Sequence, residues 1–99
     1  MARSDLFRNE NEEDYLLDVQ SELLSGLNTR VVVPLLPRSS GPAAAEHLNP
    51  VFIIQDQEVV MATQFMAAVP QSELRTAFDS LEAKRDEIAA ALDTLFLGF

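Results

Sequence analysis

The sequence predicts a mainly β protein, a small antiparallel barrel or sheet with one C-terminal α-helix packed against it. Two observations lead to this fold class. Short segments with the two-residue period or the β-branched composition of strands recur through the first 70 residues. After Pro70 the apolar residues recur at intervals of three and four, which is the period of an amphipathic helix. A chain of 99 residues fits one compact domain, residues 1–99.

The amino-terminal part predicts two strands followed by a connection. Leu6–Phe7 is an apolar island between polar residues and predicts a short strand. Residues 15–20 alternate between an apolar set and a set that carries Asp18 and Gln20, which predicts a half-buried strand. Residues 21–29 contain Ser, Gly and Asn, which favour turns, and we expect a connection there.

The next segment predicts a third strand and a loop. Residues 30–36 are rich in valine and leucine, and Pro34 within them belongs at a strand end, a bulge or a sheet edge, because proline cannot donate a backbone hydrogen bond. Residues 37–42 hold two prolines, two serines and a glycine and predict a loop. A helical turn can follow at residues 43–46.

A hairpin and a helix complete the prediction. Residues 51–54 and 59–62 are apolar and flank a polar turn at 55–58, which is the pattern of an antiparallel hairpin. Another short strand is expected at about 65–69. The helical pattern then follows, strongest over 82–96, with Gly98 as its stop. Its apolar positions are Leu74, Phe78, Leu81, Ile88, Leu92, Leu95 and Phe96.

Composition excludes several functions. Sixteen acidic against seven basic residues give a net charge of −9, which repels phosphate backbones and anionic lipids, so we expect no direct nucleic-acid and no membrane partner. The absence of cysteine excludes disulfides and thiolate metal sites, and neither a metal nor another cofactor is expected. The sequence lacks a long apolar segment, and a cytoplasmic location is expected.

Candidate catalytic groups are weak. His47 follows Glu46, but adjacent residues point apart in regular structure, so a structural or surface histidine is favoured over an acid–base pair. Neither a Gly-x-Ser-x-Gly motif nor a glycine-rich phosphate loop is present, and an enzyme is not expected. Four acidic residues could be imagined as a cation site, but they lack the spacing of a calcium loop and predict a solvated loop. They are Glu10, Glu12, Glu13 and Asp14.

The carboxyl-terminal end is unusually apolar for an acidic chain, and it has two interpretations. In the first, Leu95 and Phe96 cover the core and the remaining residues cap the helix. In the second, the end faces partners: a homodimer buries Leu95 and Leu97, and Gly98 and Phe99 form an exposed tip for another protein.

Five short motifs, in this order along the chain, resemble the CcdB toxin family. The resemblance implies an SH3-like barrel with a C-terminal helix that forms a homodimer. It also implies a toxin of a type II toxin–antitoxin system that binds the gyrase A protein of DNA gyrase and traps the gyrase–DNA cleavage complex without catalysis of its own. A CcdA-like antitoxin with a disordered tail would neutralise it. The motifs are Leu17–Leu24, Val33–Leu35, Asn49–Val51, Met66–Pro70 and Phe96–Phe99.

The resemblance also assigns site residues. In the family the last residues read Trp-Gly-Ile and contact gyrase, and the matching positions here are Leu97, Gly98 and Phe99. A family asparagine near this contact corresponds to Asp93, and isoleucines of a gyrase-facing loop correspond to Leu23–Leu24.

Two alternatives stay open at this point. The first is an endoribonuclease of the related MazF-like fold, but the arginines are spread along the chain, whereas RNA cleavage needs positioned acid–base and cationic groups. The second is a degenerate CcdB-like protein that keeps dimer and antitoxin binding but no longer poisons gyrase. Leu97 motivates it, because leucine lacks the aromatic face that stacks on a guanidinium.

Overall fold

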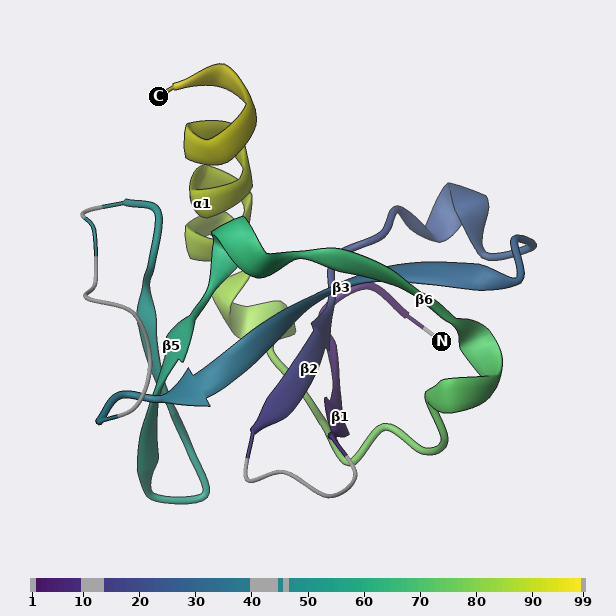
Figure 1. The fold of residues 1–99 in the computed structure, drawn as a ribbon, viewed down its shortest axis with the longest axis horizontal. Helices are drawn as coiled ribbons and strands as arrows, with labels where there is room; N and C mark the ends of the chain where they lie inside the picture. The colour runs from purple at the N-terminus through teal and green to yellow at the C-terminus, as the bar shows by residue number, and fades with distance from the viewer. Residues whose placement is uncertain (1, 10–13, 40–44, 46, 99) are drawn as a thin grey trace.

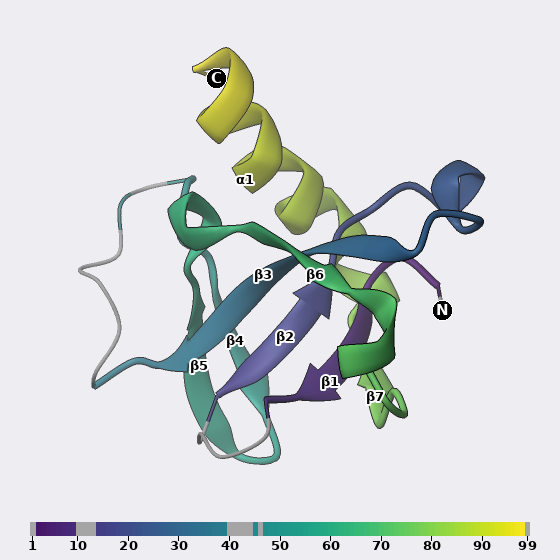
Figure 2. The ribbon, with the colours of Figure 1, turned by 45° about the vertical axis from the view of Figure 1, so that its right-hand side comes forward.

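The computed structural model describes residues 2–9, 14–39, 45 and 47–98 and confirms the predicted fold class. A curled antiparallel sheet forms a half-barrel. The α-helix of the described residues, α1, is the last element of the chain and packs against this sheet (Figures 1 and 2). The strands are β1 Asp5–Arg8, β2 Tyr15–Asp18, β3 Thr29–Pro37, β4 Val51–Ile54, β5 Gln57–Met61, β6 Ala67–Pro70 and β7 Asp79–Ser80; the 3₁₀ turns are η1 Glu22–Leu24, η2 Thr63–Phe65, η3 Gln71–Glu73 and η4 Glu82–Lys84; and α1 is Arg85–Leu97.

Strand β3 is the centre of the sheet. The order is β4-β5-β3-β2-β1-β7, and β6 also pairs with β3. One edge of β3 pairs with β2, while the other pairs first with β6, over Thr29–Val32, and then with β5, over Leu35–Pro37. The long diagonal ribbon of β3 in Figure 1 therefore carries three neighbours. This arrangement bends the sheet, because β5 and β6 diverge from the same edge.

Pro34 is predicted at a strand end, a bulge or a sheet edge. It lies instead within the central strand β3, at the point where β3 changes partner from β6 to β5. Its carbonyl accepts a hydrogen bond from the Ala62 amide at 3.0 Å. The amide and carbonyl of one strand residue point to the same side, so the donor that proline lacks would face the gap between β6 and β5. The missing donor therefore removes no hydrogen bond to β2.

The apolar core has two parts on opposite faces of the sheet. The main part lies between the sheet and α1 and includes Ile88 and Ala91 of the helix. The smaller part consists of Phe7, Val32 and Leu74. Strands β1 and β3 contribute to both parts, so they are buried on both faces. The remaining members of the main part are Leu6, Tyr15, Leu17, Val19, Val33, Leu35, Phe52, Ile54, Val59 and Met61.

The helical pattern is correct for 82–96 and wrong between Pro70 and Leu81. The segment 74–81 contains the short strand β7 and no helix, and it hydrogen-bonds to the N-terminal segment: Phe78 N donates to Leu6 O, and Leu81 N donates to Ser4 O. The apolar spacing arises because the segment crosses the edge of the sheet, with Leu74 in the smaller core and Phe78 against the main one. Apolar residues that are buried in two separate cores thus have the same spacing in the sequence as the apolar face of a helix.

The hairpin is confirmed with a shorter turn than predicted. Strand β5 begins at Gln57, which pairs with Ile54, so Gln55 and Asp56 alone form the turn instead of residues 55–58. Both have positive φ, 50° and 66°. This is the geometry of a two-residue I′ turn, for which Asn-Gly is the usual signal. The sequence carries no such signal here, so the short turn could not be predicted.

Another predicted strand boundary differs slightly from the structure. The short strand expected at about 65–69 is β6, and Phe65 belongs to the preceding turn η2. Residues 43, 44 and 46 of the expected helical turn, and 40–42 of the expected loop, lie outside the described residues.

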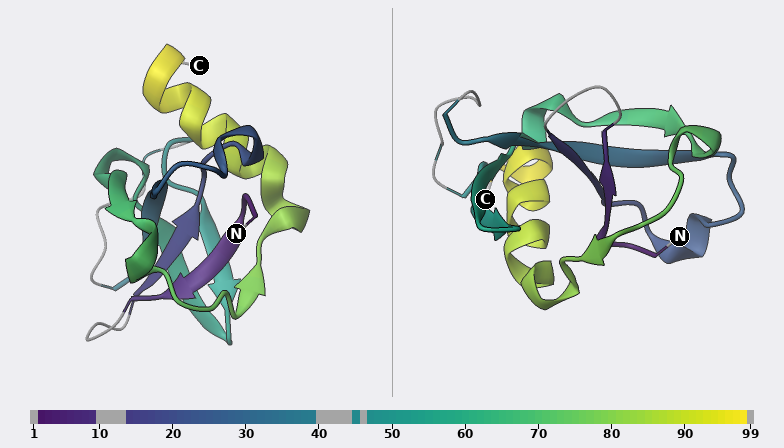
Figure 3. Two further views of the ribbon diagram at one scale, coloured as in Figure 1. Left: turned by 90° about the vertical axis from the view of Figure 1, so that its right-hand side faces the viewer. Right: turned by 90° about the horizontal axis from the view of Figure 1, so that it is seen from below.

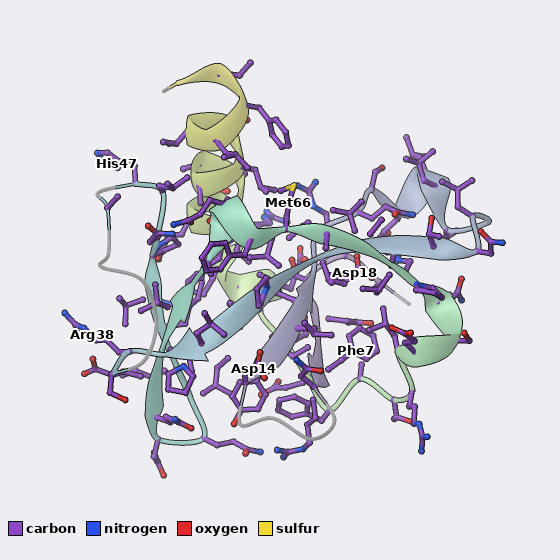
Figure 4. All side chains as sticks on the ribbon, in the orientation of Figure 1. Phe7, Asp14, Asp18, Arg38, His47 and Met66 are labelled. Atoms are coloured by element: carbon purple, nitrogen blue, oxygen red, sulfur yellow. The ribbon has the colours of Figure 1, made fainter. Side chains whose placement is uncertain are left out.

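The polar face predicted for residues 15–20 is wrong, because Asp18 and Gln20 are buried. Asp18 and Arg30 are 0% and 1% exposed and form an ion pair in the interior, where β2 meets β3 (Figure 4). Arg30 Nη2 lies 2.7 Å and Nε 2.8 Å from Asp18 Oδ2, and Gln20 N donates to Asp18 Oδ1 at 3.0 Å. Burial raises the pKa of the Asp18 carboxyl, and the bonds from Gln20 and Arg30 oppose that rise.

We predict that Asp18→Asn lowers the free energy of unfolding by about 3–5 kcal/mol, because it leaves the Arg30 charge buried without a counter-ion. The apolar double variant Asp18→Leu/Arg30→Met should lose less than either single variant, since it removes both desolvation penalties. Urea denaturation compares the wild type, Asp18→Asn, the single variants Asp18→Leu and Arg30→Met, and the double variant. Single variants that lose under about 1 kcal/mol would contradict the prediction.

Candidate functional site

The carboxyl-terminal turns of α1 present apolar side chains to solvent. The first half of the helix is anchored by Ile88 and Ala91 in the main core, and Leu95 is half-buried. The last turns extend beyond the sheet (Figures 1 and 2). There Phe96 is 68% and Leu97 60% exposed. The interpretation in which Phe96 covers the core is therefore wrong, because the helix outruns the sheet that could cover it.

Gly98 ends the helix in a conformation that favours glycine. Its φ is +81°, and its amide donates to Thr94 O at 3.1 Å, which satisfies a carbonyl of the last turn. A Cβ at this position would meet no atom of the chain within 4 Å. Its own chain therefore requires glycine here for the backbone angle and not for space.

The other site residues expected at this end fall in different situations. Asp93 is exposed on α1. Leu95 and Leu97 are two positions apart, which places them about 200° apart around the helix axis. Phe99 lies outside the described residues.

A second apolar surface lies at η1. Leu23 is 95% exposed, and Leu24 and Leu27 are about half exposed. Ser21 caps the turn, since its hydroxyl accepts from Leu23 N at 3.2 Å. No residue of η1 itself is buried. The leucines are therefore presented by local polar contacts and not by packing into the core.

The two apolar surfaces of one chain are separate. A pocket of about 270 Å³ is lined by Glu22 of η1 and by Arg85 and Ala89 of the first half of α1. Figure 3 shows the helix from two sides. Leu97 follows Ala89 by eight residues, or about 12 Å along the axis. The structure brings Leu23 and Leu24 together, and Phe96 and Leu97 together, but not the two pairs.

Sequence reasoning missed three exposed apolar residues. Phe65 lies on η2, which packs beside α1, and Leu27 extends the surface of η1. Ile53 is exposed on β4. Only Leu27 carried a usable signal, because it stands with Leu23 and Leu24 in a turn-forming segment.

The groups considered for catalysis or metal binding do not assemble into a site. Within residues 2–9, 14–39, 45 and 47–98, no group of three or more His, Cys, Asp or Glu side chains could hold a metal ion. His47 is exposed, as expected of a surface histidine, and lies on the outside of the molecule (Figure 4). Asp14 is buried and accepts two bonds of 3.2 Å from Asn9 Nδ2, which corrects its assignment to a solvated loop.

The other three acidic residues of that cluster, Glu10, Glu12 and Glu13, lie outside the described residues. The described part of the chain also holds no helix with the length and apolar character needed to cross a lipid bilayer.

The fold and its solvent-facing leucines define an SH3-like half-barrel whose C-terminal helix and η1 turn present apolar side chains. The family model described as CcdB protein matches residues 3–98, and the chain belongs to the CcdB family. Membership places it among the toxins of toxin–antitoxin systems. The resemblance drawn from five motifs is thereby confirmed.

We predict that Gly98→Ala lowers the free energy of unfolding by about 1 kcal/mol, because alanine is strained at positive φ. Gly98→Asn should lose less, since asparagine tolerates the left-handed region better. Thermal unfolding compares the three proteins. If alanine were as stable as glycine, backbone strain would not explain this residue.

Proposed function

We propose that this chain is the gyrase-directed toxin of a type II toxin–antitoxin system, acting in the cytoplasm as a homodimer without catalysis or a cofactor. The tip of α1, with Leu97, Gly98 and Phe99, engages the gyrase A protein of DNA gyrase, and Asp93 and Leu23–Leu24 extend the contact. Binding holds gyrase on cleaved DNA. A CcdA-like antitoxin opposes this by binding the dimer.

The observation that carries the proposal is the exposed apolar end of a well-anchored helix. Phe96 and Leu97 stand in water on a protein of net charge −9, although burying such a side chain gains about 1.5–3 kcal/mol. Exposed apolar side chains that cluster in this way are typical of a protein-binding surface. Membership of the CcdB family supports gyrase as the partner.

The buried polar groups support a binding function over RNA cleavage. The Asp18–Arg30 pair places a carboxylate beside a guanidinium, but both side chains are closed off from solvent. A general acid or base must come within hydrogen-bond reach of the substrate. The pair cannot reach one without opening the sheet, so it supports a structural role.

We assign Leu95 and Leu97 to the dimer interface. Leu95 is half-buried and Leu97 is exposed near the end of α1. Leu97 points about 200° away from Leu95 around the helix axis, and it also belongs to the gyrase contact. Asp93 adds a negative charge where the family has a neutral amide, and it favours a cationic group on the partner.

A homodimer predicts that sedimentation equilibrium at micromolar concentration gives about twice the chain mass of 11.0 kDa. Leu95→Asp should raise the dimer dissociation constant at least about 100-fold, because an unpaired charge in an apolar contact costs several kcal/mol. Ala90→Asp is the matched control, since Ala90 is exposed on another side of the same helix. A folded wild-type monomer at this concentration would refute the dimer.

The gyrase contact predicts that a chain lacking residues 97–99 loses binding to a gyrase A fragment while it stays folded. Leu97→Trp should bind about 10-fold more tightly, because the indole adds apolar area and an aromatic face. Calorimetric titration measures affinity, and a gyrase cleavage assay measures trapping of the cleaved complex.

Ile53→Ala is the control for this series, because Ile53 is similarly exposed but lies on β4, away from the helix tip. It should bind like the wild type. Equal binding by the wild type and the shortened chain would remove the tip from the mechanism. Dimer formation and antitoxin binding without any gyrase binding would indicate the degenerate alternative.

A further inference from the structure

The turn η1 holds its leucines in place without an apolar anchor. Its own residues are exposed, and its internal hydrogen bonds are local: Leu23 N to Ser21 Oγ at 3.2 Å, Leu24 N to Ser21 O at 3.0 Å, Ser25 N to Glu22 O at 3.2 Å and Leu27 N to Leu24 O at 3.1 Å. Short 3₁₀ turns of this kind are marginal by themselves. A contact from the body of the protein is needed to give Leu23 and Leu24 a defined position.

Gln20 supplies that contact from a buried position. Its side-chain Nε2 donates to Leu24 O of η1 at 3.1 Å, and its Oε1 accepts from Val31 N of β3 at 3.0 Å. Its backbone amide donates to Asp18 Oδ1 at 3.0 Å. The side chain therefore links the turn η1 to β3, and the backbone amide of the same residue contacts the buried ion pair.

The chemistry at this position requires a primary amide of this length. The Val31 amide can only donate and the Leu24 carbonyl can only accept, so the oxygen of the side chain faces β3 and its nitrogen faces η1. A glutamate has no donor for the carbonyl, and a methionine has neither group. An asparagine is shorter by one methylene and does not span the two partners.

We propose that Gln20 is the positioning residue of the η1 surface, and that it fixes Leu23 and Leu24 in the conformation that meets the partner. This inference rests on the proposed function for the identity of that partner, gyrase A. Without the amide bridge the leucines sample many conformations, and ordering them on binding reduces affinity. Gln20 itself, being buried, touches no partner.

The first test uses the toxin alone. Gln20→Met keeps the length and bulk of the side chain but removes both bonds. It should raise amide exchange at Ser25 and Leu27, and native-state thermolysin cleavage at Leu23–Leu24, by about 10-fold, in line with the loss of side-chain hydrogen bonds. The matched control is Thr63→Val, which removes a buried hydroxyl bond to Leu48 O away from the loop. It should leave both rates at η1 unchanged.

The second test measures affinity for the gyrase A fragment. Gln20→Met should bind about 10-fold more weakly than Thr63→Val. Gly26→Ala in the Gln20→Met background should recover part of the loss, because it restricts the loop, and a Cβ at Gly26 meets nothing within 4 Å.

The outcomes separate the two proposals. Unchanged exchange and cleavage at η1 in Gln20→Met would overturn the positioning role. A loosened turn with unchanged gyrase affinity would overturn it as well, while the gyrase contact would stand. If the wild type does not bind the fragment, the gyrase function fails, and the exchange and cleavage rates still decide whether Gln20 fixes η1.

Discussion

The buried ion pair of Asp18 and Arg30 is the constraint on which the rest of the structure depends. It links the end of β2 to the part of β3 that pairs with β6, so it connects the strands on the two edges of β3. Arg30 Nη1 has no hydrogen-bond acceptor among the described residues, so the pair is not fully satisfied. Such a pair contributes little net stability but strongly disfavours arrangements that separate the charges. Its value is then in specifying one pairing of β2 and β3.

The strands and the helix that the sequence predicts correctly are those with a strong local signal. Residues 15–20 alternate, residues 30–36 are rich in β-branched residues, and residues 82–96 have a helical period. The failures have long-range causes. Leu74 and Phe78 belong to different cores, and the partner of Asp18 lies twelve residues away, so no local window contains the information. The short turn that begins at Gln55 could not be predicted, because its residues have positive φ but do not form the Asn-Gly or Asp-Gly pair that usually indicates such a turn.

The candidate site divides in the same way. Periodicity draws attention to the carboxyl-terminal leucines but does not tell whether they cover the core, since that depends on how far the helix outruns the sheet. The gyrase contacts proposed for Leu97 and Leu23 rest on the family resemblance and not on the sequence pattern. The hydrogen bonds of the Gln20 side chain could not be predicted, because the alternation with apolar residues placed Gln20 on a solvent-exposed face of the strand. Supporting polar contacts of this kind are specified by tertiary structure.

Pro34 has a consequence for how the chain avoids pairing errors during folding. Strands β5 and β6 are consecutive and pair with the same edge of β3. An alignment shifted by two residues would therefore still bury the apolar side chains. A slip of two residues, however, would place Pro34 opposite a strand carbonyl that expects an amide proton, and that carbonyl would be buried without a partner. Pro34 thus disfavours the shifted alignment, because only the native alignment gives every strand carbonyl at this edge a hydrogen-bond donor.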